Sequence, residues 1–207
     1  MSLSPQTIRD SLRHLRAADP VLKRVIQQVG PCTLKLRKDR FQSLVRSIVS
    51  QQISGHAARA ILQRLDQLVA PDRLSPNAIG ALTEDRLRSV GLSKQKASYL
   101  LDLTRSIQAG NMQLNQIGRL SDEKIIGQLT QVKGIGRWTA QMFLMFSLGR
   151  PDVLPYDDLG IRSALRNLYA LDELPNKAAC EAIAQPWQPH TTVACWYCWR
   201  SLDLPNE

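Results

Sequence analysis

The sequence is short of cysteine and of acidic side chains, and each shortage narrows the classes of protein to which it can belong. Its four cysteines, Cys32, Cys180, Cys195 and Cys198, are scattered along 207 residues. Small secreted domains held together by disulfides are much denser in cysteine. Only Cys195 and Cys198 have metal-ligand spacing, and no second pair lies near them in the sequence. We therefore expect reduced, mostly buried thiols in a cytoplasmic protein, and no bound metal.

The sequence also lacks long apolar runs. No stretch reaches the roughly 18 apolar residues that a membrane span needs, and polar residues 1–10 lack the apolar centre of a signal peptide. We therefore expect no membrane partner. The chain is nevertheless 43% hydrophobic, which is enough for a sizeable core. Its 27 Lys and Arg residues outnumber 18 Asp and Glu residues, and this net charge of +9 favours a polyanionic partner.

Helical periodicity dominates, and no stretch shows convincing strand alternation. Asp19 and Pro20 are typical of a helix start, and that helix is expected to end at Gly30. An amphipathic stripe with helical spacing is formed by Phe41, Leu44, Val45, Ile48 and Val49. Further helices are expected over approximately residues 61–69, 83–91, 94–107, 121–129, 136–148, 158–171 and 180–202. We expect an all-α protein of about ten helices in two lobes, with a cleft between them.

The most informative segment is Leu129–Ala140, in which a tight turn joins two helical patterns. Gly134 and Gly136 have no Cβ, so they can adopt φ above zero and let a phosphate approach the backbone. The amides at the start of the second helix lack helical partners and lie at the positive end of its dipole. With Lys133 and Arg137 adding charge, the segment favours a nucleic-acid phosphate. Taken alone, the glycines are explained more simply as a helix end followed by an ordinary turn.

A second landmark follows the hairpin, in the segment Asp152–Arg162 with its Leu-Pro-Tyr-Asp-Asp sequence. Together the two landmarks resemble the helix-hairpin-helix (HhH-GPD) DNA glycosylases, a superfamily with a Gly/Pro-rich loop and one essential aspartate. The likeness extends through Phe41–Ser54 and the Trp-rich end, and it is nearest to the 3-methyladenine-DNA glycosylase II group. It implies a single glycosylase unit over residues 1–207, with approximate lobes formed by residues 1–40 plus 150–207 and by residues 41–149.

The resemblance assigns the catalytic role to Asp157, the aspartate of a Pro-x-Asp pattern. Asp158 is left as a cap or first-turn acid of the next helix. Breaking an N-glycosidic bond builds positive charge on the sugar, which a fixed carboxylate stabilises while it orients a water. A purine alkylated at N3 or N7 is already cationic, so it leaves without protonation. We therefore expect excision of alkylated purines, such as 3-methyladenine and 7-methylguanine, from double-stranded DNA in base excision repair.

Aromatic residues of the hairpin and of the chain's end are the candidate base pocket. A flipped cationic purine stacks well on indole faces, and the resemblance matches Trp138 and Trp199 to aromatic pocket positions. Met142, one turn after Trp138, and Tyr156, beside the aspartates, are further candidates, although helix packing also explains each of them. Glycosylases that also cut the strand carry a lysine where this sequence has Trp138. An indole cannot form the Schiff base of that reaction, so we expect a monofunctional enzyme without lyase activity.

The remaining site predictions concern contacts with DNA. The resemblance implies that Gly134, Gly136 and Thr139 hold a phosphate, assisted by Lys133 and Arg137. It also places the side chain that fills the vacated position in the duplex just after the helix of residues 41–49. The candidates are Gln52 first, then Gln51 or Ile53, with His56 as a candidate backbone contact. A polar helix end is the alternative explanation for this segment.

Cofactors and other functions complete the expectations. Two cysteines cannot hold the iron–sulfur cluster of related endonuclease III-type enzymes, so we expect none. A monovalent cation held by hairpin carbonyls is compatible with the family, and a monomer suffices to wrap a kinked duplex. Two other functions stay open, a non-enzymatic DNA-binding module and a glycosylase for neutral bases such as uracil. A carboxylate aimed into an anionic groove argues against the first, and the sequence does not decide the second.

Overall fold

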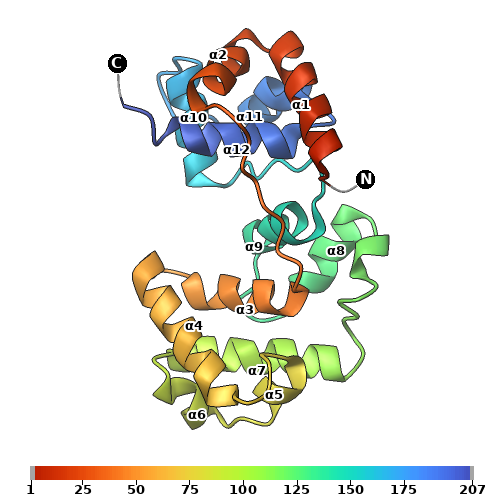
Figure 1. Ribbon diagram of the computed structural model, residues 1–207, viewed down its shortest axis with the longest axis vertical. Helices are drawn as coiled ribbons and strands as arrows, with labels where there is room; N and C mark the ends of the chain where they lie inside the picture. The colour runs from red at the N-terminus through yellow and green to blue at the C-terminus, as the bar shows by residue number, and fades with distance from the viewer. Residues whose placement is uncertain (1–2, 206–207) are drawn as a thin grey trace. The chain divides into compact units, whose positions relative to one another are not determined.

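The computed structural model describes residues 3–205, and within that range every regular element is a helix (Figure 1). Twelve α-helices are present there, so the predicted all-α class is confirmed. Over the same residues, no helix has both the length and the apolarity that a bilayer span requires. Two compact units are present, a terminal unit of residues 1–36 and 144–207 and a central unit of residues 37–143. These boundaries differ from the expected ones, which lay after residues 40 and 149.

The terminal unit combines the N-terminal and the C-terminal segments of the chain. Its helices are α1 (Pro5–Ala18), α2 (Pro20–Val29), α10 (Leu159–Leu168), α11 (Lys177–Ala184) and α12 (Thr191–Ser201). A π-helix (Leu144–Leu148) and a short 3-10 helix (Gln185–Trp187) complete it. Helix α12 packs against both α2 and α10, and α1 packs against α2. The core of the terminal unit is therefore built from residues far apart in the sequence, among them Leu15, Leu22, Ile161 and Trp187, all of them buried.

A buried carboxylate fixes the start of α2 in this unit. Asp19 caps the helix through Oδ1, which accepts hydrogen bonds from the amides of Val21 and Leu22. Its Oδ2 accepts from the Tyr169 hydroxyl and from the Trp187 indole N–H. A buried carboxylate is tolerated only when such donors replace water. The predicted cap is confirmed, and it also joins three parts of the unit.

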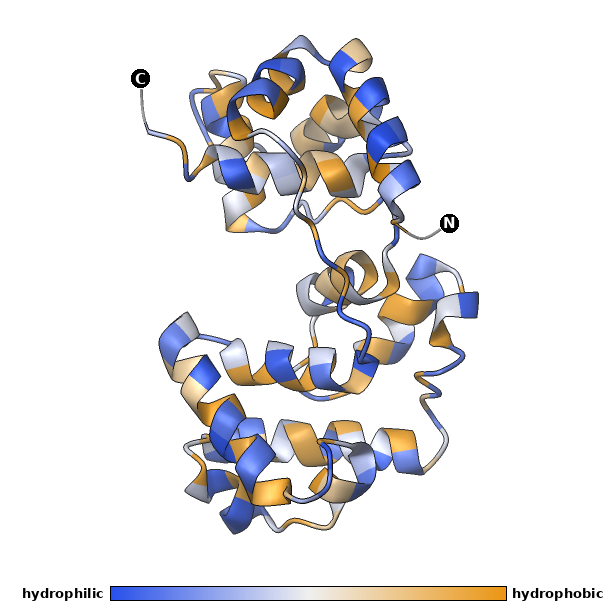
Figure 2. Cartoon of the chain, in the orientation of Figure 1, coloured by the Kyte–Doolittle hydropathy of each residue, from blue (hydrophilic) through white to orange (hydrophobic). Residues whose placement is uncertain are grey.

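The central unit contains the helices of the middle of the sequence, residues 37–143. They are α3 (Arg40–Ser50), α4 (Gly55–Val69), α5 (Pro76–Gly80), α6 (Glu84–Ser89), α7 (Lys94–Gln108), α8 (Asp122–Leu129) and α9 (Arg137–Phe143), with a short 3-10 helix at Ile117–Arg119. The predicted apolar stripe of α3 is buried throughout. Helix α7 packs against α3, α5 and α6, which makes it the scaffold of this unit. Figure 2 shows hydrophobic and hydrophilic residues alternating along the helices, as expected where one face is buried.

Some helices differ from the sequence-based expectation. The helical segment expected over residues 180–202, with Pro186 and Pro189 as interruptions, is divided near those prolines, because they lack the amide hydrogen that a continuous helix needs. Helix α1 was not predicted, since its sequence is mostly polar and it buries only Ser11 and Leu15. The second hairpin helix reaches Leu148 as expected, but its last residues form the π-helix.

Candidate functional site

Two adjacent aspartates of the terminal unit have different surroundings. Asp158 is the N-cap of α10, and its Oδ1 accepts a hydrogen bond from the Ile161 amide at 2.8 Å. The same oxygen accepts the indole N–H of Trp199 at 2.9 Å. Asp158 is half-buried, whereas Asp157 is exposed. The expected capping role of Asp158 is confirmed, and the structure brings Trp199 to Asp158 rather than to Asp157.

The surroundings of the Asp158–Trp199 pair include three residues that sequence reasoning missed. The Phe146 ring, carried by the π-helix, lies 5.8 Å from the Trp199 ring between centroids. A Cβ added to Gly160 would lie 3.0 Å from both Asp158 Oδ1 and Trp199 Cδ1, so only glycine fits without displacing the pair. Leu159 is 64% exposed at the first turn of α10. π-Helical segments often occur at functional sites, but this one is visible only in the structure, so no local sequence signal pointed to Phe146.

Tyr156 has a structural partner. The ammonium of Lys177, at the start of α11, lies 4.9 Å from the centroid of its ring. This cation–π contact occupies ring surface that a cationic purine would also need. The structure therefore gives Tyr156 a packing role, and its membership of a base pocket stays a prediction.

The hairpin of the central unit is held by α7. Gly134 has φ of +81°, and a Cβ there would lie 2.0 Å from the Tyr99 ring, so both conformation and packing require glycine. The Lys133 amide donates to Asp102 Oδ2 at 3.0 Å. Gly136, by contrast, is exposed, lies outside the left-handed region, and would place a Cβ in open space. Open space beside the start of α9 leaves room for a ligand to approach the backbone.

The predicted residues of α9 divide between surface and interior. Trp138 is 43% exposed, and Met142 is half-buried one turn later, on the same face of the helix. Thr139 is only 4% exposed, so its side chain is buried, and the predicted phosphate contact stays a prediction. Arg137 forms an ion pair with Glu123, with a shortest distance of 2.6 Å. Its charge is therefore partly neutralised within the hairpin, which the sequence did not reveal.

The loop between α3 and α4 contains the candidates for insertion into a duplex. The side chain of Gln51 donates to the Gly134 carbonyl at 2.8 Å, so it is already engaged with the hairpin. Gln52 is exposed and has φ of +55°, and Ile53 is 36% exposed. His56 is exposed near the start of α4. Of the two glutamines, Gln52 is the one whose side chain is accessible, which agrees with its place as first candidate.

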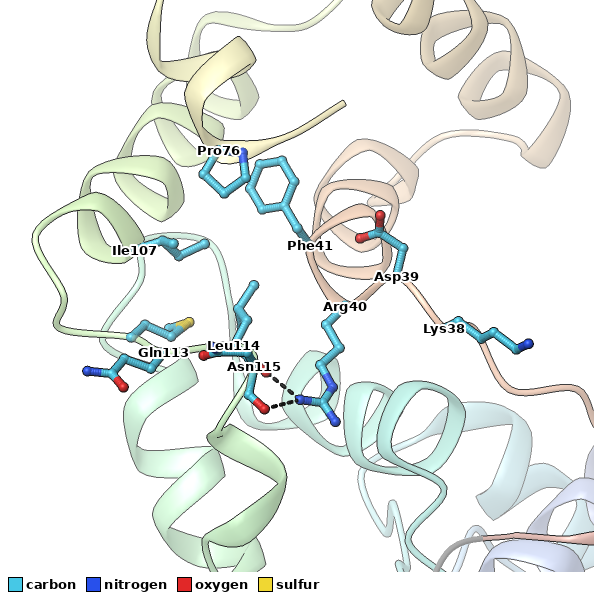
Figure 3. A pocket seen from close by; sticks show the side chains of 10 residues that line it. Lys38, Asp39, Arg40, Phe41, Pro76, Ile107, Gln113, Leu114 and Asn115 are labelled. Carbon is cyan, nitrogen blue, oxygen red and sulfur yellow. Dashed lines mark hydrogen bonds between the residues drawn. The ribbon is translucent and has the colours of Figure 1, made fainter. Parts of the chain in front are cut away.

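A hollow of about 600 Å³ elsewhere in the central unit is distinct from these residues (Figure 3). It lies between the start of α3 and the connector after α7, and its apolar lining includes Phe41 and Ile107. Arg40 donates to the carbonyls of Leu114 and Asn115, which fixes the connector in place. None of the predicted site residues lines this hollow.

The cysteines are free thiols, as expected, with Cys180, Cys195 and Cys198 buried. Burial raises the pKa of Cys198 to about 12 and that of Cys195 well above its ordinary value. Among residues 3–205, no group of three His, Cys, Asp or Glu side chains could hold a metal ion. The expectation of no iron–sulfur cluster stays a prediction, as does the monovalent cation at the hairpin. The Gly134 carbonyl of that hairpin already accepts a hydrogen bond from Gln51.

Comparison with known proteins identifies the family. Residues 45–189 match the model of the HhH-GPD superfamily base excision DNA repair protein. The chain is 35% identical over 198 residues to DNA-3-methyladenine glycosylase 1 of Schizosaccharomyces pombe, covering 93% of this chain and 87% of that protein.

Solved structures agree with that match. The S. pombe 3-methyladenine DNA glycosylase in complex with abasic DNA superposes with a TM-score of 0.82 at 34% identity, over 94% of this chain and 97% of that one. A DNA-3-methyladenine glycosidase from Bacillus halodurans gives a TM-score of 0.84 at 36% identity, over 97% and 91%. The protein described here therefore belongs to the HhH-GPD superfamily of base excision DNA repair proteins.

Proposed function

We propose that this protein is a monofunctional DNA glycosylase that removes alkylated purines, such as 3-methyladenine and 7-methylguanine, from duplex DNA. The observation that carries the proposal is the carboxylate of Asp158, held in place by Trp199 in a chain of this superfamily. The named relatives support the substrate class, because the S. pombe protein is called a DNA-3-methyladenine glycosylase and matches nearly the whole chain. The net charge of +9 suits a nucleic-acid substrate.

The chemistry requires one fixed negative charge. Cleavage of the glycosidic bond develops positive charge on the sugar, and a positioned carboxylate stabilises that charge and directs a water to the anomeric carbon. The leaving purine is already cationic when it is alkylated at N3 or N7, so no second carboxyl group is needed to protonate it. Neutral bases such as uracil need more activation, which makes them the less favoured substrates of this site.

The geometry favours Asp158 over the sequence-based choice of Asp157 as the catalytic carboxylate. Asp158 is fixed by two donors, the Ile161 amide and the Trp199 indole, and a preorganised anion stabilises a transition state at little further cost. Asp157 is exposed, where solvent screens its charge. The Pro-x-Asp pattern favours Asp157, but such a pattern does not indicate which of two adjacent carboxylates is fixed by hydrogen bonds.

The residues proposed to contact DNA lie in the central unit. We propose that a backbone phosphate approaches the hairpin at the exposed Gly136, with Lys133 adding charge, and that Gln52 fills the position of the flipped nucleotide. Trp138 is exposed and offers an indole surface to the base. Because it stands where strand-cutting relatives carry lysine, hydrolysis by water without a lyase step is proposed.

A panel of duplexes, each carrying one lesion, tests the proposal. We expect release of 7-methylguanine and 3-methyladenine, little release of uracil, and strand cleavage only after added alkali. Asp158→Asn should lower the excision rate at least about a hundredfold. Asparagine also caps helices well, so this variant should fold and keep its affinity for abasic duplex.

Asp157→Asn is the matched comparison and should retain most activity. The reverse result would return the catalytic role to Asp157. DNA binding by the wild-type protein without release of any base would favour the non-enzymatic module instead. Strand cleavage without alkali would contradict the monofunctional mechanism.

A further inference from the structure

The loop of residues 51–54 is tied to its surroundings by two side chains. Lys96 of α7 extends its ammonium to the C-terminal end of α3, where it donates to the Val49 carbonyl at 2.8 Å and to the Gln51 carbonyl at 2.6 Å. Gln51 in turn donates its side-chain amide to the Gly134 carbonyl at 2.8 Å. A continuous chain of hydrogen bonds therefore runs from α7 through the loop to the hairpin.

The position of Lys96 suits a structural cation. The last carbonyls of a helix lack helical partners, and they lie at the negative end of the helix dipole, which favours a positive charge there. Burial lowers the pKa of Lys96, so its half-buried position carries a desolvation penalty. The two short bonds to backbone carbonyls offset that penalty. A surface lysine with no such partners would instead extend into solvent.

The loop that Lys96 holds contains a strained residue. Gln52 has φ of +55°, a region that non-glycine residues seldom occupy, and its side chain is exposed. Strain of this kind persists only where the neighbouring structure holds the backbone in place. Gln51, immediately before it, is fixed through both its carbonyl and its side chain. The exposed Gln52 therefore projects from a fixed base.

Helix α7 also holds the hairpin. Tyr99, one turn after Lys96, packs against Gly134 so closely that a Cβ there would overlap its ring. Asp102, a further turn along, accepts the Lys133 amide. Lys96, Tyr99 and Asp102 recur at every third residue, so they lie along neighbouring turns of one side of the helix. Lys96 therefore contacts the loop, and Tyr99 and Asp102, on the following turns of α7, contact the hairpin.

We propose that Lys96 is a positioning residue that, with Tyr99 and Asp102, holds the 51–54 loop and the hairpin at a fixed separation. This inference rests on the proposed function. When the hairpin binds a backbone phosphate, the fixed separation places Gln52 at the nucleotide to be extruded. Lys96 itself touches neither the base nor the sugar. Its contribution is to base extrusion, and the hydrolytic step after extrusion does not depend on it.

Lys96→Met tests the proposal, because methionine approximates the side-chain length and removes the donors. Single-turnover excision of 7-methylguanine is measured on two duplexes, one with cytosine opposite the lesion and one with a stable abasic analogue opposite it. Extrusion costs least where the base is already unpaired. We expect the variant to be about tenfold slower on the paired duplex and within about twofold of wild type on the unpaired one.

Two further variants sharpen the comparison. Lys94→Met removes an exposed lysine two residues away on the same helix and should leave both rates unchanged. Lys96→Arg should recover most of the paired-duplex rate, because a guanidinium can also donate to both carbonyls. The fluorescence of 2-aminopurine placed beside the lesion should rise more slowly with Lys96→Met than with wild type, since it reports extrusion directly.

The outcomes separate this inference from the proposed function. A wild-type rate for Lys96→Met on the paired duplex, or an equal loss on both duplexes, would overturn the positioning role. If Lys96→Met does not fold, Lys96→Gln decides by the same comparison, because its shorter side chain cannot donate to both carbonyls. Failure of the wild-type protein to release any methylated base would contradict the proposed function, and the 2-aminopurine signal would still report on Lys96.

Discussion

The indole N–H of Trp199 donates to Asp158 Oδ1 at 2.9 Å, which joins α12 to the first turn of α10. The two residues are far apart in the sequence, and neither carries a local signal of the other. The same oxygen accepts a hydrogen bond from the Ile161 amide, at the start of the helix that Asp158 caps. The orientation of this carboxylate is therefore set by a helix start on one side and by an aromatic side chain on the other.

Trp199→Phe should separate these two supports. Phenylalanine keeps an aromatic surface but cannot donate, so we expect the single-turnover excision rate to fall about tenfold while affinity for abasic duplex is retained. Trp196→Phe, in the same helix, is the control and should stay close to wild type in rate. Equal losses in the two variants would show that the indole of Trp199 acts only through packing.

Gly160→Ala should impair the same pair by crowding. The added Cβ would lie 3.0 Å from Asp158 Oδ1 and from Trp199 Cδ1, so the carboxylate or the indole must shift. We expect excision to slow about tenfold or more, because small displacements of a catalytic group are costly. Gly127→Ala, in α8, places its Cβ in open space and is the control. An unchanged rate for Gly160→Ala would mean that the exact position of Asp158 does not matter.

The two hairpin glycines should respond differently to alanine. In Gly134→Ala the alanine would have to adopt a positive φ, and its Cβ would overlap the Tyr99 ring. The free energy of unfolding should therefore fall by at least about 2 kcal/mol. Gly136→Ala meets no neighbour and should change it by less than about 0.5 kcal/mol. It should instead weaken binding to abasic duplex, because a methyl group stands where the phosphate approaches. Thermal melting and fluorescence anisotropy measure the two effects, and a normal affinity for Gly136→Ala would argue against this approach.

Alkaline pH should destabilise the protein through its buried phenols and thiols. Burial raises the pKa of Tyr197 to about 12, and that of Cys198 also to about 12. A folded-state pKa above the unfolded one favours the neutral form, so this stability is complete below the unfolded pKa of about 9 to 10. We expect the free energy of unfolding to fall as the pH rises from about 9 towards 12.

Tyr197→Phe isolates the phenol's share of that loss. It removes the hydrogen bond to the Gly30 carbonyl, so stability at pH 7 should drop by about 1 kcal/mol. Above about pH 10 its decline should be shallower than that of wild type, because no phenol remains to ionise. Denaturant titrations at several pH values provide the measurement, and an unchanged slope for Tyr197→Phe would contradict the expectation.

The two adjacent aspartates could not be distinguished by their local sequence. The Pro-x-Asp pattern favours Asp157, which is exposed, whereas the proposed catalytic residue is Asp158. Arg137 was expected to assist a phosphate, yet it pairs with Glu123. Thr139 was expected beside the phosphate; α9 buries its side chain, and the contact stays a prediction. In each case the residue type indicated a kind of contact. The direction of the side chain depends on neighbours that are distant in the sequence, so the local sequence does not reveal it.

The amino-acid sequence alone determined most of the helices, the cap at Asp19 and the glycine turn, because these depend on residues within a few positions of one another. Asp19 before α2, the apolar stripe of α3 and Gly134 in the hairpin are all of this kind. Only the tertiary structure decided which carboxylate is held by Trp199, and that Lys96 of α7 supports the loop at Gln51. Those contacts join residues distant in the chain, so they exist only once the helices have packed.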